Sequence, residues 1–264
     1  MDDETKLTVV QIKELLNLSD GHSADLLAKL ANDPRKSVQK LVESKKRDIE
    51  KDKLLLQAHE ERLSIERALK KHPNIHYIAG IDEVGRGPLA GPVVAAAVIL
   101  PEDCSRLIGV TDSKQLSHNK RKEYDQLIRE VAIDYKIAVI DSQLIDRLNI
   151  YEATRVAMLE AVHQLDRTPD YLLLDAMKID SKIPQQSVVK GDQKSLSIAA
   201  ASIIAKVYRD EMMMAYGELY PEFGFDTHMG YGTKKHLDAL RDYGFTPIHR
   251  QSFAPVTNTL KQYK

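Results

Sequence analysis

The pattern of apolar and polar positions divides the chain into two parts. From Thr8 to Lys71, apolar residues recur at helical spacing, which predicts helices. Between Lys40 and Lys71 about half of the residues are charged, so this stretch is predicted to be one long solvated helix. The segment His72-Pro73-Asn74 ends the pattern. We therefore expect an N-terminal helical extension over residues 1–72 and a second domain over residues 73–264.

Beyond this boundary the pattern is that of an α/β domain. Short apolar runs with β-branched residues predict strands, and longer amphipathic stretches predict helices between them. The expected strands cover residues 75–81, 93–100, 135–140, 171–174 and 187–190, and the expected helices cover residues 120–131, 151–165, 195–217 and 234–243.

Two adjacent acids, Asp82 and Glu83, stand where the first expected strand meets the glycine-rich segment 85–91. A buried carboxylate without compensation is strongly disfavoured, so such acids usually have a cation, a hydrogen-bond network or a shifted pKa. The alternative is structural. Asp82 then caps the turn and Glu83 is exposed, because neighbouring strand residues point to opposite faces.

Two further acids follow expected strands. Asp175 ends the apolar run 172–174, and Asp192 follows Gly191 after the run 187–190. Carboxylate oxygens without sulfur or nitrogen ligands suit Mg²⁺ or Mn²⁺ better than zinc. The alternative for Asp192 is an ordinary turn residue, since Asp after Gly is common in turns.

Composition limits the possible classes of protein. Hydrophobic residues at 43% and charged residues at 29% are typical of a globular chain, and a formal net charge of −1 permits nucleic acid without favouring it. The single cysteine, Cys104, excludes an intramolecular disulfide and a multi-cysteine zinc site. The nine histidines have no recognised zinc spacing, and we assign them no metal. Lacking an apolar run of ~20 residues or a basic leader, the protein is expected in the cytoplasm, without membrane contact.

Several motifs in consistent order resemble those of bacterial ribonuclease HII over about residues 75–255. They read DEVGRGPLAGPV from Asp82, LLLDAM from Leu172, VVKGDQKSLSIAAASIIAKVYRD from Val188, HMGYGTKKH from His228 and HRQSF from His249. Any one of these motifs alone is weak, and their combination is specific.

The resemblance implies a ribonuclease H-like fold, with a mixed five-stranded sheet flanked by helices. It also implies four carboxylates that gather at one end of the sheet and bind Mg²⁺ or Mn²⁺. Carried over to this chain, the catalytic and metal-binding set is Asp82, Glu83, Asp175 and Asp192. Asp210 is an alternative to Asp192, but its position deep in an expected helix indicates a structural or surface acid.

The resemblance assigns substrate binding to Gly85, Arg86, Gly87 and Tyr231. The glycines would let the backbone approach the minor groove and sense a ribose 2′-hydroxyl, which distinguishes RNA from DNA. Tyr231 would stack on the sugar on the DNA side of an RNA–DNA junction. In the alternative reading, Arg86 only pairs with Glu83 and Tyr231 is a core tyrosine.

The expected activity is therefore hydrolysis of the RNA strand of RNA–DNA hybrids and incision of duplex DNA at embedded ribonucleotides, with two metal ions and with 5′-phosphate and 3′-hydroxyl products. Asp112-Ser113-Lys114 and Lys190 are candidates for phosphate or active-site support. A ribonuclease HIII-like enzyme and a non-catalytic hybrid-binding module are the alternatives. The helical first part of the chain argues against ribonuclease HIII, whose N-terminal domain is β-rich. We expect a monomer and predict no specific protein partner.

Overall fold

The computed structural model describes residues 7–18 and 23–262. Its backbone contacts separate two compact units, Met1–Ala58 and His59–Lys264. In the first unit, helices α1, α2 and the N-terminal part of α3 bury an apolar core of its own, formed by Ile12, Leu16, Leu27, Leu30, Val38 and Val42. The three helices are α1 (Val9–Leu18), α2 (Ser23–Leu30) and α3 (Lys36–Arg62).

The long helix expected over residues 40–71 is not continuous. Helix α3 ends at Arg62, and a separate helix, α4 (Ser64–Lys70), follows after Leu63. Leu63 is buried in the core of the second unit, so its apolar side chain sits at the break. The prediction of a single helix was wrong, because charge and periodicity continue across the position at which the helix divides. The boundary after residue 72 stays a prediction.

The second unit is built on a mixed five-stranded sheet with the order β3-β2-β1-β4-β5. The pairs β1–β2 and β2–β3 are antiparallel, whereas β1–β4 and β4–β5 are parallel. The strands are β1 (Ile78–Val84), β2 (Val93–Ile99), β3 (Asp134–Ile140), β4 (Tyr171–Asp175) and β5 (Gln185–Val188).

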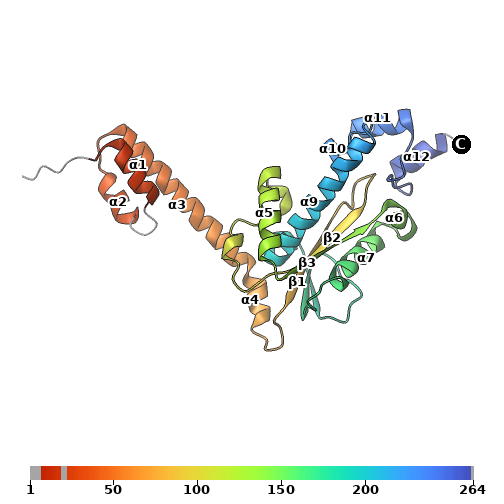
Figure 1. Cartoon of the computed structure of the whole chain (residues 1–264), viewed down its shortest axis with the longest axis horizontal. Coiled ribbons are helices and arrows are strands. Elements are labelled where there is room, and N and C mark those ends of the chain that lie inside the picture. The colour runs from red at the N-terminus through yellow and green to blue at the C-terminus, as the bar shows by residue number, and fades with distance from the viewer. Residues whose placement is uncertain (1–6, 19–22, 263–264) are drawn as a thin grey trace, which may run out of the picture. The chain divides into compact units, whose positions relative to one another are not determined.

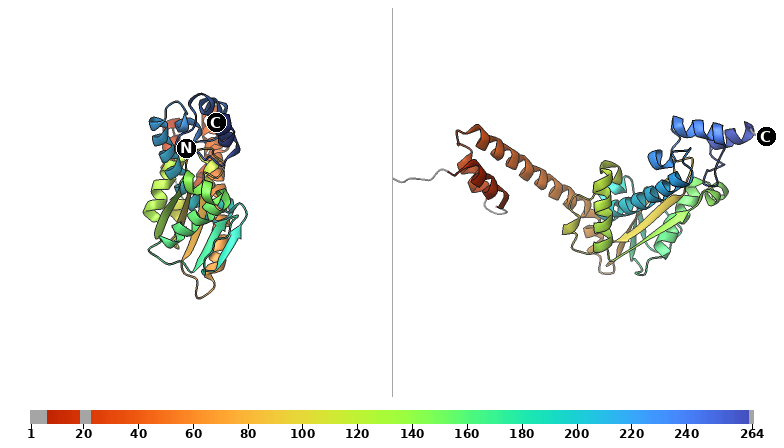
Figure 2. Two further views of the ribbon diagram at one scale, coloured as in Figure 1. Left: turned by 90° about the vertical axis from the view of Figure 1, so that its right-hand side faces the viewer. Right: turned by 45° about the horizontal axis from the view of Figure 1, so that its top comes forward.

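Helices cover both faces of this sheet, with α9 and α5 on one side and α7 on the other (Figure 1). The right-hand view of Figure 2 shows α9 running along the strands. The helices of this unit, besides α4, are α5 (His118–Val131), α6 (Ser142–Leu148), α7 (Ile150–His163), α8 (Gly191–Lys194), α9 (Leu196–Leu219), α10 (Phe225–His228), α11 (Lys234–Tyr243) and α12 (Ala254–Gln262), with 3-10 turns η1 (Ser105–Leu107) and η2 (Ser113–Gln115). The expected mixed sheet flanked by helices, with a helical N-terminal region, is confirmed.

Alternation along the strands explains the two layers. In β2 the odd-numbered residues from Val93 to Ile99 pack toward α7, and the even-numbered residues from Val94 to Val98 pack toward α9. Helix α9 approaches β1 so closely that a Cβ atom on Gly80 would collide with the backbone of Ser197. Helix α9 therefore begins beside the first half of β1, while α8, which precedes it, lies at the acidic end of the sheet, where Gly191 N–H bonds Asp175.

Strand β1 lies three residues further along the chain than the sequence predicts. It begins at Ile78 rather than at residue 75, and it runs on to Val84. Asp82 and Glu83 are therefore part of the strand, not of the turn after it. No helix among the described residues is long and apolar enough to cross a membrane.

Candidate active site

The first acidic pair lies on the central strand β1. Asp82 is buried, with 5% of its surface exposed, and pairs in register with Ala96 of β2. Its Oδ1 accepts a hydrogen bond of 2.8 Å from the backbone N–H of Glu83. The Oε1 atom of Glu83 pairs with Arg86 at 3.3 Å, while its Oε2 is buried without a hydrogen-bond partner in the described part of the chain.

Strand β4 brings Asp175 to the same end of the sheet. The parallel register places Ile81 opposite Leu174, so Asp82 and Asp175 follow at the carboxyl ends of this ladder. The pKa values of the neighbouring acids show the effect of this crowding of carboxylates. Burial, and then the charges of Glu83 and Asp175, raise the pKa of Asp82 well above its usual value. Burial also raises the pKa of Glu83, where Asp175 adds to the effect.

Asp192 joins the cluster from the short helix α8. The N–H of the preceding residue, Gly191, donates a 2.7 Å hydrogen bond to Oδ1 of Asp175, which ties α8 to the end of β4. Burial, followed by the charges of Asp112 and Asp175, raises the pKa of Asp192 to about 6. Asp192 therefore lies close enough to Asp112 and Asp175 for their charges to act on it. With only 7% of its surface exposed, it is not the solvent-exposed turn residue of the alternative interpretation.

Asp112 is a fifth acid that sequence reasoning left outside the catalytic set. It is buried, caps the 3-10 turn η2 by accepting a 2.9 Å hydrogen bond from Lys114 N–H, and also accepts one of 3.4 Å from Gln193. Its charge raises the pKa of Asp192. The motif Asp112-Ser113-Lys114 was a sequence signal for this region, but its distance along the chain from Asp192 concealed their proximity.

A cavity of about 230 Å³ opens beside the acids and combines negative and positive groups. Lys114 and Lys206 bring ammonium groups to it, and the hydroxyls of Ser113 and Ser202 lie 2.9 Å apart at its wall. Such a mixture suits a phosphodiester, whose charge the lysines would neutralise. The complete lining consists of Asp82, Glu83, Val84, Ser113, Lys114, Asp175, Ser202, Lys206 and Tyr231.

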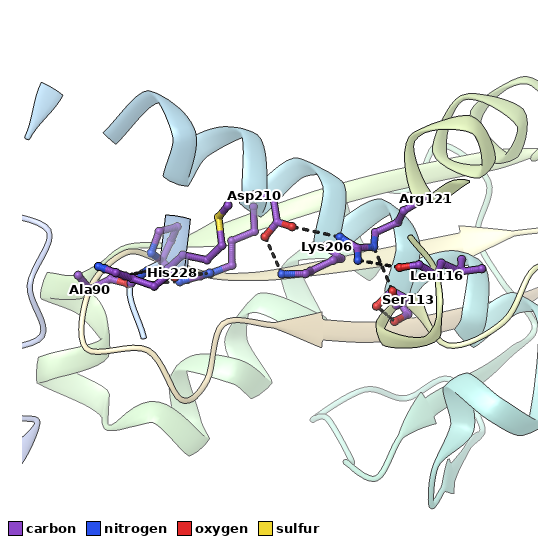
Figure 3. A network of polar contacts seen from close by, with 12 residues as sticks. Ala90, Ser113, Leu116, Arg121, Lys206, Asp210 and His228 are labelled. Carbon is purple, nitrogen blue, oxygen red and sulfur yellow. Dashed lines mark hydrogen bonds and ion pairs between the residues drawn. The ribbon is translucent and has the colours of Figure 1, made fainter. Parts of the chain in front are cut away.

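Asp210 does not line this cavity but contacts residues that do or that pack next to it. Its carboxylate accepts a 2.7 Å hydrogen bond from Lys206 and a 3.3 Å hydrogen bond from Arg121, as Figure 3 shows. Arg121 in turn donates to the backbone carbonyls of Ser113 and Leu116. Asp210 therefore fixes a cavity lysine and the 112–116 segment. The interpretation of Asp210 as a structural acid agrees with this geometry.

Of the residues expected to read the substrate, Tyr231 lines the cavity and Gly87 lies beside Tyr231. A Cβ atom on Gly87 would touch only Tyr231, at 3.5 Å, so the two positions are neighbours with open space around Gly87. Tyr231 is 47% exposed, which contradicts the alternative of a core tyrosine. Arg86 does pair with Glu83, as the other alternative held, although its side chain remains 43% exposed.

Three histidines, His228, His236 and His249, pack together next to the backbone of Tyr231. His236 and His249 join their Nε2 atoms at 2.9 Å, and the Nδ1 of His236 bonds the carbonyl of Tyr231 at 2.9 Å. The rings of His228 and His236 stack at 4.8 Å between centroids. These contacts make the histidines part of the support for the Tyr231 segment.

The donor set fits a hard divalent cation in its chemistry. All ligand candidates are carboxylate oxygens, burial and crowding raise the pKa values of Asp82, Glu83 and Asp192, and Oε2 of Glu83 is buried without a partner in the described structure. Within the described residues, no three Asp, Glu, His or Cys side chains surround a common point in the way a formed metal site does. The acids gather at one end of the sheet without closing around one ion.

A mixed sheet with carboxylates at the ends of its central strands defines the class of ribonuclease H-like nucleases. Sequence comparison identifies the family within it. The model of the ribonuclease HII family matches residues 79–256, and that of the ribonuclease HII N-terminal domain matches residues 8–70. The chain belongs to the ribonuclease HII family, whose members are endoribonucleases.

Individual relatives agree with this assignment. Ribonuclease HII of Bacillus subtilis (strain 168) is 51% identical over 250 residues, which cover 95% of this chain and 97% of the relative. The crystal structure of ribonuclease H2 from Pyrococcus horikoshii OT3 matches with a TM-score of 0.63 and 27% identity, over 71% of this chain and 99% of that one. Bst-RNase HIII in complex with Mn²⁺ shares the fold, with a TM-score of 0.54 and 21% identity, over 74% of this chain and 72% of the other.

Proposed function

We propose that this protein hydrolyses the RNA strand of RNA–DNA hybrids and incises duplex DNA at embedded ribonucleotides. One observation supports this most directly: the cavity that contains Asp82, Glu83 and Asp175 also contains Tyr231, which neighbours Gly87. A group that can distinguish ribose from deoxyribose therefore lies within reach of the acids that would support hydrolysis.

We further propose that Asp82, Glu83, Asp175 and Asp192 hold Mg²⁺ or Mn²⁺. Bound there, the ions would supply Lewis acidity for the attack of water on the phosphate and for the departure of the 3′-oxygen. Their positive charge would also offset the burial and the carboxylate repulsion that raise the pKa values of Asp82 and Glu83. The relative in complex with Mn²⁺ has the same fold, which is consistent with this assignment.

The remaining residues of the cavity bind and orient the substrate. Lys114 and Lys206 place positive charge beside the acids, where a scissile phosphate would otherwise be repelled. Asp210 holds Lys206 at 2.7 Å, so this ammonium group is fixed before the substrate arrives. In this proposal no serine, cysteine or histidine acts as nucleophile, and hydrolysis leaves 5′-phosphate and 3′-hydroxyl ends.

Selection of ribonucleotides is proposed for Gly85, Arg86, Gly87 and Tyr231. The open space at Gly87 permits a sugar-phosphate backbone to approach the main chain. The exposed ring of Tyr231 offers a stacking surface next to it. We also propose that the enzyme works in the cytoplasm as a monomer.

A substrate panel tests the activity. A duplex with one embedded ribonucleotide and an RNA–DNA hybrid should be cleaved in Mg²⁺, and the same duplex made entirely of DNA should remain intact. Asp82→Asn should abolish cleavage while the protein stays folded, because it removes an anionic ligand from a crowded site. Asp166→Asn is the matched control, since that side chain is 84% exposed and pairs with Lys136 at the surface.

The panel also separates the alternatives. A non-catalytic hybrid-binding module would bind the ribonucleotide-containing duplexes and cut none of them. Full cleavage by Asp82→Asn would remove this carboxylate from the proposed metal site.

A further inference from the structure

Two arginines in the second unit are completely buried, and among the described residues neither has an ion-pair partner. Arg209 of α9 and Arg250, which precedes α12, each have 0% of their surface exposed. Burial lowers the pKa of Arg209 to about 10 and that of Arg250 to about 9. Taking a guanidinium out of water is costly, so their hydrogen-bond partners must compensate for it.

Those partners are backbone carbonyls of residues 85–92, which we call the glycine loop. Arg250 donates to the carbonyl of Gly85, to that of Arg86 at 2.9 Å, and twice to that of Gly91, at 3.0 and 2.8 Å. Its guanidinium therefore holds two carbonyls of the Gly85-Arg86-Gly87 motif and one near the far end of the loop. Only a planar fork with several donors can satisfy such a set.

Arg209 connects the glycine loop to residues 229–233, which we call the tyrosine loop. It donates to Pro92 O at 2.9 Å and Ala90 O at 3.2 Å in the glycine loop, and to Met229 O at 3.0 Å in the tyrosine loop. A backbone hydrogen bond of 2.8 Å from Leu89 N–H to Gly230 O joins the same two loops. The two segments that would read the substrate are thus bound to one buried cation.

The packing around Arg209 leaves little room for movement. Gly85 has a φ of +93°, and a Cβ there would collide with the Arg209 side chain and approach Pro92 O to 2.7 Å. Gly230, with a φ of +84°, lies against the carbonyl of Ala90 in the same way. Both glycines are required by close contact and by backbone conformation.

The geometry of the peptide bond links Arg250 to the backbone N–H groups that would contact the substrate. In a planar trans peptide the C=O of one residue and the N–H of the next point in opposite directions. Because Arg250 binds the carbonyls of Gly85 and Arg86, the N–H groups of Arg86 and Gly87 must point away from it. In the described structure neither N–H donates to another protein atom.

We propose that Arg250 and Arg209 are positioning residues that set the selectivity for ribonucleotides. Arg250 directs the N–H groups of Arg86 and Gly87 outward as donors for an acceptor oxygen of the substrate sugar. Arg209 holds the tyrosine loop at a fixed distance from those donors. This inference rests on the proposed function, and it adds two residues that touch neither the substrate nor the carboxylates.

The test compares binding of two duplexes of the same sequence, one with a single ribonucleotide and one entirely of DNA, in Ca²⁺. Arg250→Lys keeps the charge but replaces the planar fork, which makes four hydrogen bonds from three nitrogen atoms, with a single ammonium nitrogen that cannot reach all three carbonyls in the same geometry. It should reduce the preference for the ribonucleotide duplex about tenfold, which corresponds to about 1.4 kcal/mol, and leave affinity for the DNA duplex unchanged. Single-turnover cleavage of the ribonucleotide duplex should fall by a similar factor.

Arg155→Lys is the matched control. Arg155 also donates to a backbone carbonyl, that of Lys178 at 3.1 Å, but it lies on α7 away from both loops. Its substitution should alter neither affinity. If Arg250→Lys does not yield a folded protein, Arg209→Lys provides the same comparison, with the same expected loss of preference.

The possible outcomes separate this inference from the proposed function. Unchanged preference in folded Arg250→Lys, or equal weakening of both duplexes, would overturn the positioning role. Absence of cleavage by the unmodified protein would instead contradict the proposed function, independently of the arginines.

Discussion

Asn in place of Asp192 should stabilise the protein in the absence of divalent ions, and by an amount that depends on pH. Burial and the charges of Asp112 and Asp175 raise the pKa of Asp192 to about 6, whereas an Asp in the unfolded chain titrates near 3.9. At a pH between these two pKa values, Asp192 keeps its proton in the folded state and has released it in the unfolded state. The free energy of unfolding therefore falls as the pH rises through this window, and the loss is complete above it.

The size of the effect follows from the shift. A difference of about two pKa units corresponds to about 3 kcal/mol, which is an upper limit because neighbouring groups relax around the charge. Since Asp192→Asn has no charge to bury, it should recover up to this amount at pH 8. For a unit of about 200 residues, where 1 kcal/mol shifts the midpoint of thermal unfolding by about 2–4 °C, the midpoint should rise by up to roughly 6–12 °C.

The assay is thermal unfolding in chelator from pH 4 to pH 8, followed by circular dichroism. The gain of Asp192→Asn over the unmodified protein should be large at pH 8 and vanish near pH 4, where Asp192 itself is protonated. Asp166→Asn should show no such trend because its side chain is exposed. A variant that is less stable at pH 8, or a gain that does not change with pH, would refute the crowding of charge at Asp192.

Three further substitutions test the cavity and its support. Gly87→Val should leave the melting temperature unchanged, because the added atoms enter open space, yet slow single-turnover cleavage of ribonucleotide substrates; normal cleavage would remove Gly87 from recognition. Tyr231→Ala should lose a stacking contribution of about 1–3 kcal/mol and slow cleavage at a single ribonucleotide tenfold or more, with a smaller loss on a long hybrid; equal losses on both would assign Tyr231 to general catalysis. Asp210→Asn leaves Lys206 and Arg121 without their buried carboxylate and should cost about 3–5 kcal/mol in chemical denaturation; a cost below 1 kcal/mol would contradict its supporting role.

The sequence predicts those site residues whose environment is local. Asp82 and Asp175 follow apolar runs long enough to be recognised as buried strands, and parallel pairing then brings their ends together. The exact end of β1 was less predictable. Hydrogen bonding to β2 extends the strand through Glu83 to Val84, and no residue pattern marks that limit.

Features that depend on contacts between distant segments could not be predicted. Asp112 and Asp192 are far apart in the chain, and only the folded structure shows that one raises the pKa of the other. Arg209, which precedes Asp210, and Arg250, which lies between His249 and Gln251, carry no local signal of burial. Their acceptors are backbone carbonyls, which the amino-acid sequence does not distinguish. The division between α3 and α4 falls at Leu63, which is buried in the core of the second unit, and helical periodicity does not record it.

The most direct test of the central claim is the rate at which a duplex with one embedded ribonucleotide is cut in Mg²⁺, in chelator, and after Mg²⁺ is restored, with the unmodified protein and Asp175→Asn side by side. We expect cleavage only with the divalent ion, 5′-phosphate and 3′-hydroxyl ends, and no cleavage by Asp175→Asn, although Gly191 N–H keeps an acceptor oxygen at that position. Undiminished cleavage in chelator, or near-normal turnover by Asp175→Asn, would contradict a nuclease that works through carboxylate-bound metal ions.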